Sequence, residues 1–108
     1  MDLKDIKRKL SIFNKMVNEN YKHRSETERL LLKSLKISEE VWEFHNEILW
    51  YVWFTRAGKE HSRKELEKEC IDVLLSTMLV ADDLWIDIEK VLEEKLKIVF
   101  KRFNLKDE

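Results

Sequence analysis

The chain has 108 residues, a length that fits one domain spanning 1–108 and not two separate cores. It contains no proline and a single glycine, Gly58, which argues against sandwiches and barrels and favours a few long helices. Charged residues make up 40% of the chain but nearly cancel to a formal net charge of -1, so the basic excess typical of a nucleic-acid-binding protein is missing. The lone cysteine, Cys70, cannot form an internal disulfide, and no secretory signal or membrane-spanning run is visible. We therefore expect a cytoplasmic all-α protein that binds neither nucleic acid nor a membrane.

Two helices are predicted in the first half of the chain. The first runs from near Asp2 to about Asn18, because its apolar residues recur at spacings of three and four. Ser25 and Glu28 then form a capping box that opens a second helix, which continues to about Phe54. This second helix is long for a globular protein, which leaves room for a bend or a break within it.

Two more helices are predicted after a turn around Gly58. Ser62 and Glu65 make a second capping box, which opens the third helix. Asp87 is suited to cap the fourth helix, whose apolar face extends to Phe103. Four helices joined by short connections predict an antiparallel four-helix bundle.

The second predicted helix is apolar on most of its circumference around Trp42, Phe44, Trp50 and Trp53. Such a helix needs more neighbours than a small monomer supplies. We therefore expect the chain to assemble as a homodimer or a homotetramer, the latter as a dimer of dimers.

Two short pairs of acids stand out inside otherwise apolar helical segments. Glu40 and Glu43 lie in SEEVWEFHNEIL, and Glu69 and Asp72 lie in ELEKECIDVLL. Residues three apart share a helix face, so each pair points two carboxylates in one direction. If the two helices meet, the four carboxylates form a site for a hard divalent cation, with Mg²⁺ expected and Mn²⁺ as a substitute.

The alternative is that these acids are ordinary solvated residues, because pairs at this spacing arise by chance in a chain with 22 acids. Asp72 argues against that reading, since it directly precedes the apolar run VLLSTMLVA. Two carboxylates 4 Å apart repel by about 4 kcal/mol at an effective dielectric of 20, so a cation or a bound proton is needed to offset the repulsion. Glu39 and Glu47 lie near the same surface as further ligands or as a base for water.

The segments KISEEVWEFHNEIL, ELEKECIDVLL and IDIEKVLEEKL together resemble the MazG-like all-α nucleoside triphosphate pyrophosphohydrolases. The small single-domain members carried on integron-type mobile gene cassettes are the most similar. The resemblance covers roughly residues 30–103. Its core is the family's E-x-x-E, spacer, E-x-x-D pattern, with a spacer over residues 44–68.

The resemblance implies that Glu40, Glu43, Glu69 and Asp72 are the catalytic metal ligands. It implies that a metal-activated water attacks a (d)NTP between the α- and β-phosphates and releases a monophosphate and pyrophosphate. Housecleaning of the nucleotide pool is one role this reaction serves. It also implies that chains pair so that helices from both line the site.

The chain departs from the family pattern at several positions. Trp42 and Trp85 stand where the family usually carries glycine, and Trp42 is expected to reshape or narrow the nucleotide pocket. Val99 and Phe100 fall where several members carry Asn and Arg on the last helix. By the resemblance, Lys95 matches a lysine on that helix that contacts the triphosphate.

Other side chains can also contribute to substrate binding. Lys36, one turn before Glu40, is suited to contact phosphate or to neutralise the acids, although a solvated helix surface is the ordinary role of such a lysine. Trp50 and its aromatic neighbours offer a flat wall for a nucleobase, but the core or a dimer interface explains them better.

Two other functions compete with the enzyme reading. A non-catalytic helical interaction or nucleotide-binding module would keep the fold with an altered pocket. A di-iron carboxylate bundle is excluded because it needs Glu-x-x-His pairs, and neither acidic pair carries a histidine.

Overall fold

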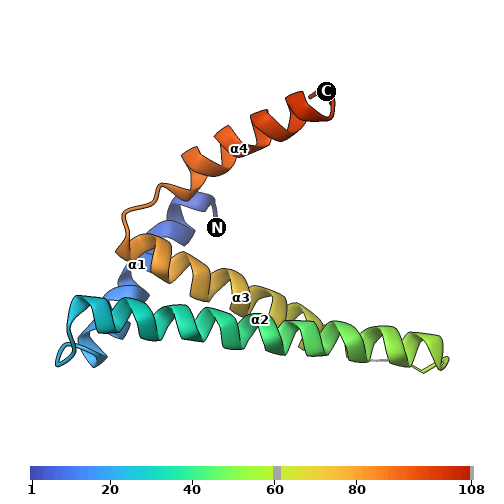
Figure 1. Ribbon diagram of the computed structural model, residues 1–108, viewed down its shortest axis with the longest axis horizontal. Coiled ribbons are helices and arrows are strands. Elements are labelled where there is room, and N and C mark those ends of the chain that lie inside the picture. The colour runs from blue at the N-terminus through green and yellow to red at the C-terminus, as the bar shows by residue number, and fades with distance from the viewer. Residues whose placement is uncertain (60–61, 108) are drawn as a thin grey trace.

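A computed structural model of the protein describes residues 1–59 and 62–107 (Figure 1). Over those ranges it contains four helices and no strand, so the predicted all-α fold is confirmed. None of these helices combines the length and the apolar character that crossing a lipid bilayer requires. The helices are α1 (Leu3–Asn20), α2 (Glu26–Arg56), α3 (Arg63–Asp83) and α4 (Ile88–Arg102).

The four described helices begin where the sequence predicts, and in three of them a side chain makes a capping hydrogen bond to the first turn. Asp2 and Asp87 each accept a hydrogen bond from a backbone amide in the first turn of α1 and α4. The Ser25 hydroxyl accepts from the Glu28 amide at 3.1 Å and also lies 3.1 Å from the Glu28 carboxylate. Ser62 is the N-cap residue of α3, so the predicted start of this helix is confirmed, but its side chain makes no capping hydrogen bond and the predicted capping box is wrong.

The two longest helices form the centre of the molecule. α2 is a single continuous helix with no break, and α3 lies antiparallel along it over most of the length of α3 (Figure 1). α1 packs more sparsely against α3, and α4 projects away from the other helices. One chain therefore has the four predicted helices but does not close them into a bundle.

The interior of one chain is small. Leu10 and Ala81 are the only buried apolar residues among those described, and each keeps a small exposed fraction. The chain exposes 9165 Å², whereas a compact protein of 13.2 kDa exposes about 6,400 Å². Its radius of gyration is 17.4 Å, against about 13 Å for a compact domain of this length. The separation of α4 contributes to the low burial, since its large apolar residues remain exposed within the described part of the chain.

A buried polar network joins α1, α2 and α3. The Lys33 ammonium donates to Asn14 Oδ1 at 2.7 Å, to Asn18 Oδ1 at 2.6 Å and to Asp83 Oδ2 at 2.5 Å. The Asn14 amide, on a residue that is only 1% exposed, donates in turn to Asp82 at 2.7 Å and to Asp83 at 2.9 Å. This network holds the second half of α1 against the C-terminal end of α3.

The network keeps the Asp83 carboxylate charged in the fold. Desolvation alone would raise the pKa of Asp83, but hydrogen bonds from Lys33, Asn18 and Asn14 outweigh it and hold that pKa below its usual value. Losing one charge of such a buried pair leaves the other without a partner, which typically costs about 3–5 kcal/mol. The contact of α1 with α3 therefore depends on complementary polar groups as well as on the buried apolar residues Leu10 and Ala81.

Three helices are each followed by a residue in the left-handed backbone conformation. Gly58, Trp85 and Asn104 follow α2, α3 and α4 with φ angles of 72°, 54° and 53°. At the end of α3 the Ile86 amide donates to the Ala81 carbonyl at 2.9 Å, and the other two ends repeat this pattern. This is the Schellman motif, in which the left-handed position favours glycine or asparagine. Trp85 is the bulky exception, and its side chain is 94% exposed.

We expect Trp85→Gly to raise the free energy of unfolding by about 1 kcal/mol, because it relieves the left-handed strain and gives up almost no packing. Gly58→Ala is the opposite control, since a Cβ there meets no neighbouring atom but must adopt a φ of 72°, and it is expected to lose about 1 kcal/mol. Urea unfolding of the original protein and the two variants, all at the same protein concentration, measures both changes. A Trp85→Gly protein that is less stable than the original would show that Trp85 contributes packing.

Candidate metal centre

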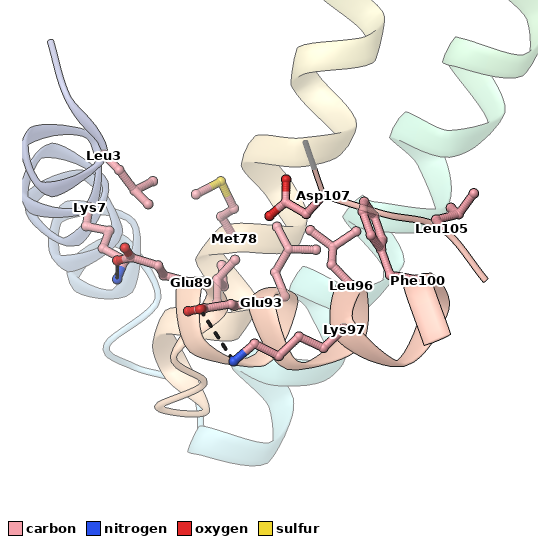
Figure 2. A pocket seen from close by; sticks show the side chains of 12 residues that line it. Leu3, Lys7, Met78, Glu89, Glu93, Leu96, Lys97, Phe100, Leu105 and Asp107 are labelled. Atoms are coloured by element: carbon pink, nitrogen blue, oxygen red, sulfur yellow. Dashed lines mark hydrogen bonds and ion pairs between the residues drawn. The ribbon is translucent and has the colours of Figure 1, made fainter. Parts of the chain in front are cut away.

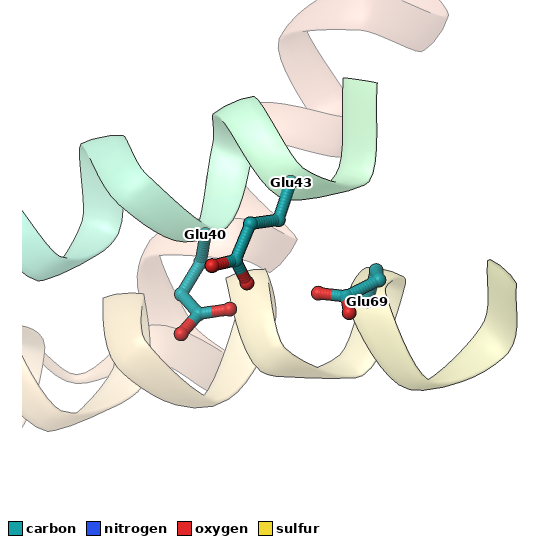
Figure 3. A group of neighbouring side chains, drawn as sticks. All are labelled: Glu40, Glu43 and Glu69. Atoms are coloured by element: carbon teal, nitrogen blue, oxygen red, sulfur yellow. The ribbon is translucent and has the colours of Figure 1, made fainter. Parts of the chain in front are cut away.

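Three carboxylates meet where α2 and α3 lie side by side. Glu40 and Glu43 come from α2 and Glu69 comes from α3, and each offers an oxygen within 4.8 Å of the other two (Figure 3). The spacing of three places the two α2 acids on one face, and the antiparallel pairing brings Glu69 opposite them. The two helices thus bring three of the four predicted acids together.

Two of these carboxylates are deeply buried and incompletely paired. The Glu40 side chain is 9% exposed, and that of Glu69 is 11% exposed. The Oε2 atom of each is shielded from solvent and has no hydrogen-bond partner among the described residues. A buried charged oxygen without a partner is costly, so apolar packing alone does not explain these side chains.

Glu43 lies closer to solvent than the other two acids. Desolvation and the negative charges of Glu40 and Glu69 raise the pKa of its carboxyl. Burial is the largest cause of this pKa shift, and the neighbouring charges add to it because each negative charge favours the protonated form of its neighbour.

Two lysines border the carboxylates. Lys36 Nζ lies 3.0 Å from Glu40 Oε1, and this hydrogen bond raises the pKa of Lys36. Lys68 Nζ lies 3.5 Å from Glu69 Oε1 and 3.7 Å from Asp72 Oδ2. Lys36 was predicted near the acids, whereas sequence reasoning missed Lys68. Its position four residues before Asp72 was the signal that could have found it.

Asp72, the fourth predicted ligand, lies outside the group of three. It follows Glu69 by three residues on α3, and its side chain is one-third exposed. Its carboxylate forms an ion pair with Lys68 on the same helix and does not join Glu40 and Glu43.

The remaining predicted binding residues do not converge on the acids. Trp42 is 63% exposed, and its ring centroid lies 6.0 Å from that of His45. Lys95 belongs to α4, which stands apart from the α2–α3 pair (Figure 1). Trp50 stacks on Phe54 at 5.8 Å, but half of the Trp50 surface remains exposed, so a core role within one chain is not observed.

Two open grooves flank the helices. The larger, about 750 Å³, lies between α1, α3 and α4 and contains none of the predicted metal ligands (Figure 2). The smaller, about 370 Å³, lies between α1, α2 and α3 and reaches Lys36 and Glu39 at the edge of the carboxylate group. Its walls are mainly apolar and aromatic: Phe13, Val17, Tyr21, Leu32, Leu35 and Leu79.

The three carboxylates supply the oxygen ligands that a hard divalent cation prefers, and the distances between their oxygens nearly fit such an ion. Mg²⁺ takes oxygen ligands at about 2.1 Å, so two opposite ligands of an octahedral site stand about 4.2 Å apart. The oxygens of Glu40, Glu43 and Glu69 lie within 4.8 Å, and small side-chain rotations would close the difference. The unpaired oxygens of Glu40 and Glu69 are the atoms that such an ion would satisfy.

Comparison of the chain with protein-family models, with curated proteins and with solved structures finds no match. Its function must therefore be argued from its own residues and their arrangement.

We expect Glu43→Gln to raise the melting temperature of the metal-free protein at neutral pH, because it removes one of three crowded charges. The folded-state pKa of Glu43 is raised, so the fold binds that proton more tightly than the unfolded chain does. The stability of the original protein should therefore fall as pH rises from about 4.3 through the folded-state pKa of Glu43. Thermal unfolding in EDTA across pH 4–8 measures this slope. An unchanged slope in Glu43→Gln would contradict the crowding.

Proposed function

We propose that the chain is a Mg²⁺-dependent nucleoside triphosphate pyrophosphohydrolase that cleaves a (d)NTP between the α- and β-phosphates. The products would be a nucleoside monophosphate and pyrophosphate, and housecleaning of the cytoplasmic nucleotide pool is the role that fits. The sequence motifs that resemble the MazG-like enzymes motivate this reaction. Among the structural observations, the buried, unpaired oxygens of Glu40 and Glu69 beside Glu43 support it most directly.

In this proposal Glu40 and Glu69 hold the cation from opposite helices, with Glu43 on the solvent side. A bound divalent cation supplies shielding of phosphate charge and lowers the pKa of an attacking water. Glu43 lies beside both carboxylates, where it is suited to serve as a third ligand or to accept the proton of that water. Asp72 can join the group by rotating toward Glu69, which lies on the same face of α3.

The substrate would approach along the smaller groove. Lys36 stands at the junction of this groove with the carboxylates and is suited to contact a phosphate. Beyond it, Phe13 and Tyr21 offer partly exposed aromatic surface to a nucleobase. This arrangement gives the charged and the apolar halves of a nucleotide separate places.

We also infer that the working form is a homodimer or homotetramer. One chain exposes about 2,700 Å² more surface than a compact protein of its mass. Two such chains would together bury about 5,500 Å² if they covered this excess, which is at the upper end of the 2,000–5,000 Å² and more that obligate interfaces bury. The exposed surface includes Trp50 and Trp53 on α2 and Leu92 and Leu96 on α4, which are suited to contacts between copies.

The alternative is a non-catalytic nucleotide-binding or interaction module. Two observations favour it: Asp72 is paired outside the group of three, and Lys95 lies on a helix that stands apart from the acids. This module would bind a metal or a nucleotide without releasing pyrophosphate.

We expect pyrophosphate release from at least one triphosphate in a panel of ribo-, deoxy- and modified nucleotides, with Mg²⁺ and not with EDTA. Glu40→Gln and Asp72→Asn should each reduce the rate by roughly a hundredfold or more. Glu67→Gln, an exposed acid on α3 that pairs with Arg63, is the matched control and should keep full activity. Full activity in Glu40→Gln would exclude the proposed site, and nucleotide binding without pyrophosphate release would favour the non-catalytic module.

Sedimentation equilibrium should give a mass of twice or four times the 13.2 kDa of one chain. Replacing the exposed Trp53 with Glu should weaken this assembly if α2 supplies the interface, because the substitution places a charge among apolar side chains. Lys22→Glu, on the polar connection between α1 and α2, is the control and should leave the mass unchanged. A monomeric mass across micromolar concentrations would contradict the assembly.

A further inference from the structure

We propose that Lys36 and Lys68 are resident counter-cations of the carboxylate group, which a divalent ion displaces and which then bind the phosphates of the substrate. This inference rests on the proposed metal centre and describes how that centre is regulated. It assigns a role to Lys68, which neither the motif nor the proposed reaction uses.

The two ammonium groups pair with the two ends of the carboxylate group. Lys36 contacts Glu40 at 3.0 Å from α2, and Lys68 contacts Glu69 at 3.5 Å from α3. Each pairs through the Oε1 atom of a glutamate whose Oε2 atom is buried without a hydrogen-bond partner among the described residues. The lysines therefore offset part of the buried negative charge and leave the inner oxygens open to an ion.

These contacts differ from other short-range ion pairs among the described residues. The pairs Lys22–Glu19, Arg24–Glu28 and Lys97–Glu93 join side chains that are all largely exposed. Lys36 and Lys68 also have exposed side chains, but their glutamate partners are about nine-tenths buried. An exposed lysine leaves its partner at little cost, whereas a buried carboxylate must keep a cation near it.

Lys68 also accounts for the position of Asp72. Its ammonium lies 3.7 Å from the Asp72 carboxylate as well as near Glu69, so it bridges the two acids along one face of α3. A divalent ion bound to Glu69 repels the ammonium, and its departure frees Asp72 to turn toward the ion. The displaced ammonium remains tethered beside the site, where a phosphate is the available anion.

The competition predicts opposite effects of one substitution on two ligands. Without Lys68, the ion no longer displaces a positive charge, so Mg²⁺ alone should bind several-fold more tightly. Once the site is filled, the loss of that charge removes a phosphate contact, so tripolyphosphate should bind several-fold more weakly. A lysine that serves only as a solvated surface charge, or only to stabilise the helix, would not produce both changes.

Isothermal titration calorimetry with Mg²⁺ alone, then with tripolyphosphate at saturating Mg²⁺, tests this on the full chain. The variants are Lys68→Met, Lys36→Met and Lys64→Met, the last being the matched control because Lys64 lies one turn earlier on α3 and has no ion pair with a described residue. Circular dichroism verifies that each variant keeps its helices. We expect the paired changes in Lys68→Met, the same directions in Lys36→Met, and neither in Lys64→Met.

The outcomes separate this inference from the proposed function. If the original protein binds Mg²⁺ and Lys68→Met binds it equally or less tightly, the proposed displacement of the lysine by the ion is overturned. The proposed metal centre is then still supported. Tighter Mg²⁺ binding with unchanged tripolyphosphate affinity overturns the transfer of the lysine to phosphate. If the original protein binds no Mg²⁺, both proposals fail.

Discussion

The burial of two carboxylates between α2 and α3 is the constraint on which the rest of this structure depends. Apolar side chains at the positions of Glu40 and Glu69 would pack the two helices at lower cost, because a carboxylate gives up its hydration when it is buried. The chain instead places negative charge there, and two lysines at the rim offset part of it. Burial, together with the charge that remains, raises the pKa of the neighbouring Glu43. Such local destabilisation is typical of functional sites, where binding a ligand offsets the cost.

The polar network around Lys33 positions the rest of the site. It fixes α1 to the C-terminal end of α3 through Asn14 and Asp83. Because hydrogen bonds have directional geometry, they set the register of α1 more narrowly than apolar contacts would. α1 carries Phe13 and Tyr21, which form one wall of the groove leading to Lys36. The same lysine network thus shapes the surface that a substrate would meet.

Local patterns in the sequence predict the helices and three of the acids, and they do not predict the tertiary partners. Apolar spacing and capping residues placed α1, α2 and α4 within two residues of their ends, because these signals act within one turn. The i,i+3 spacing placed Glu40 and Glu43 on one face for the same reason. The Lys33 network was missed because Asn14, Lys33 and Asp83 are far apart in the chain and each reads as an ordinary surface residue.

The position of α4 shows what a single chain leaves incomplete. Apolar periodicity predicts which face of a helix is buried, but it does not specify whether the neighbour is in the same chain or in another copy. α4 has a regular apolar face, yet its large apolar residues remain exposed beside the groove in Figure 2. Lys95 lies on this helix and is therefore separated from the carboxylates of its own chain. A phosphate contact by Lys95 requires either that α4 moves onto the α2–α3 pair or that another copy supplies it. Contact with another copy would also cover the exposed apolar face of α4. A single contact between copies would therefore explain both that exposed face and the distance of Lys95 from the carboxylates of its own chain.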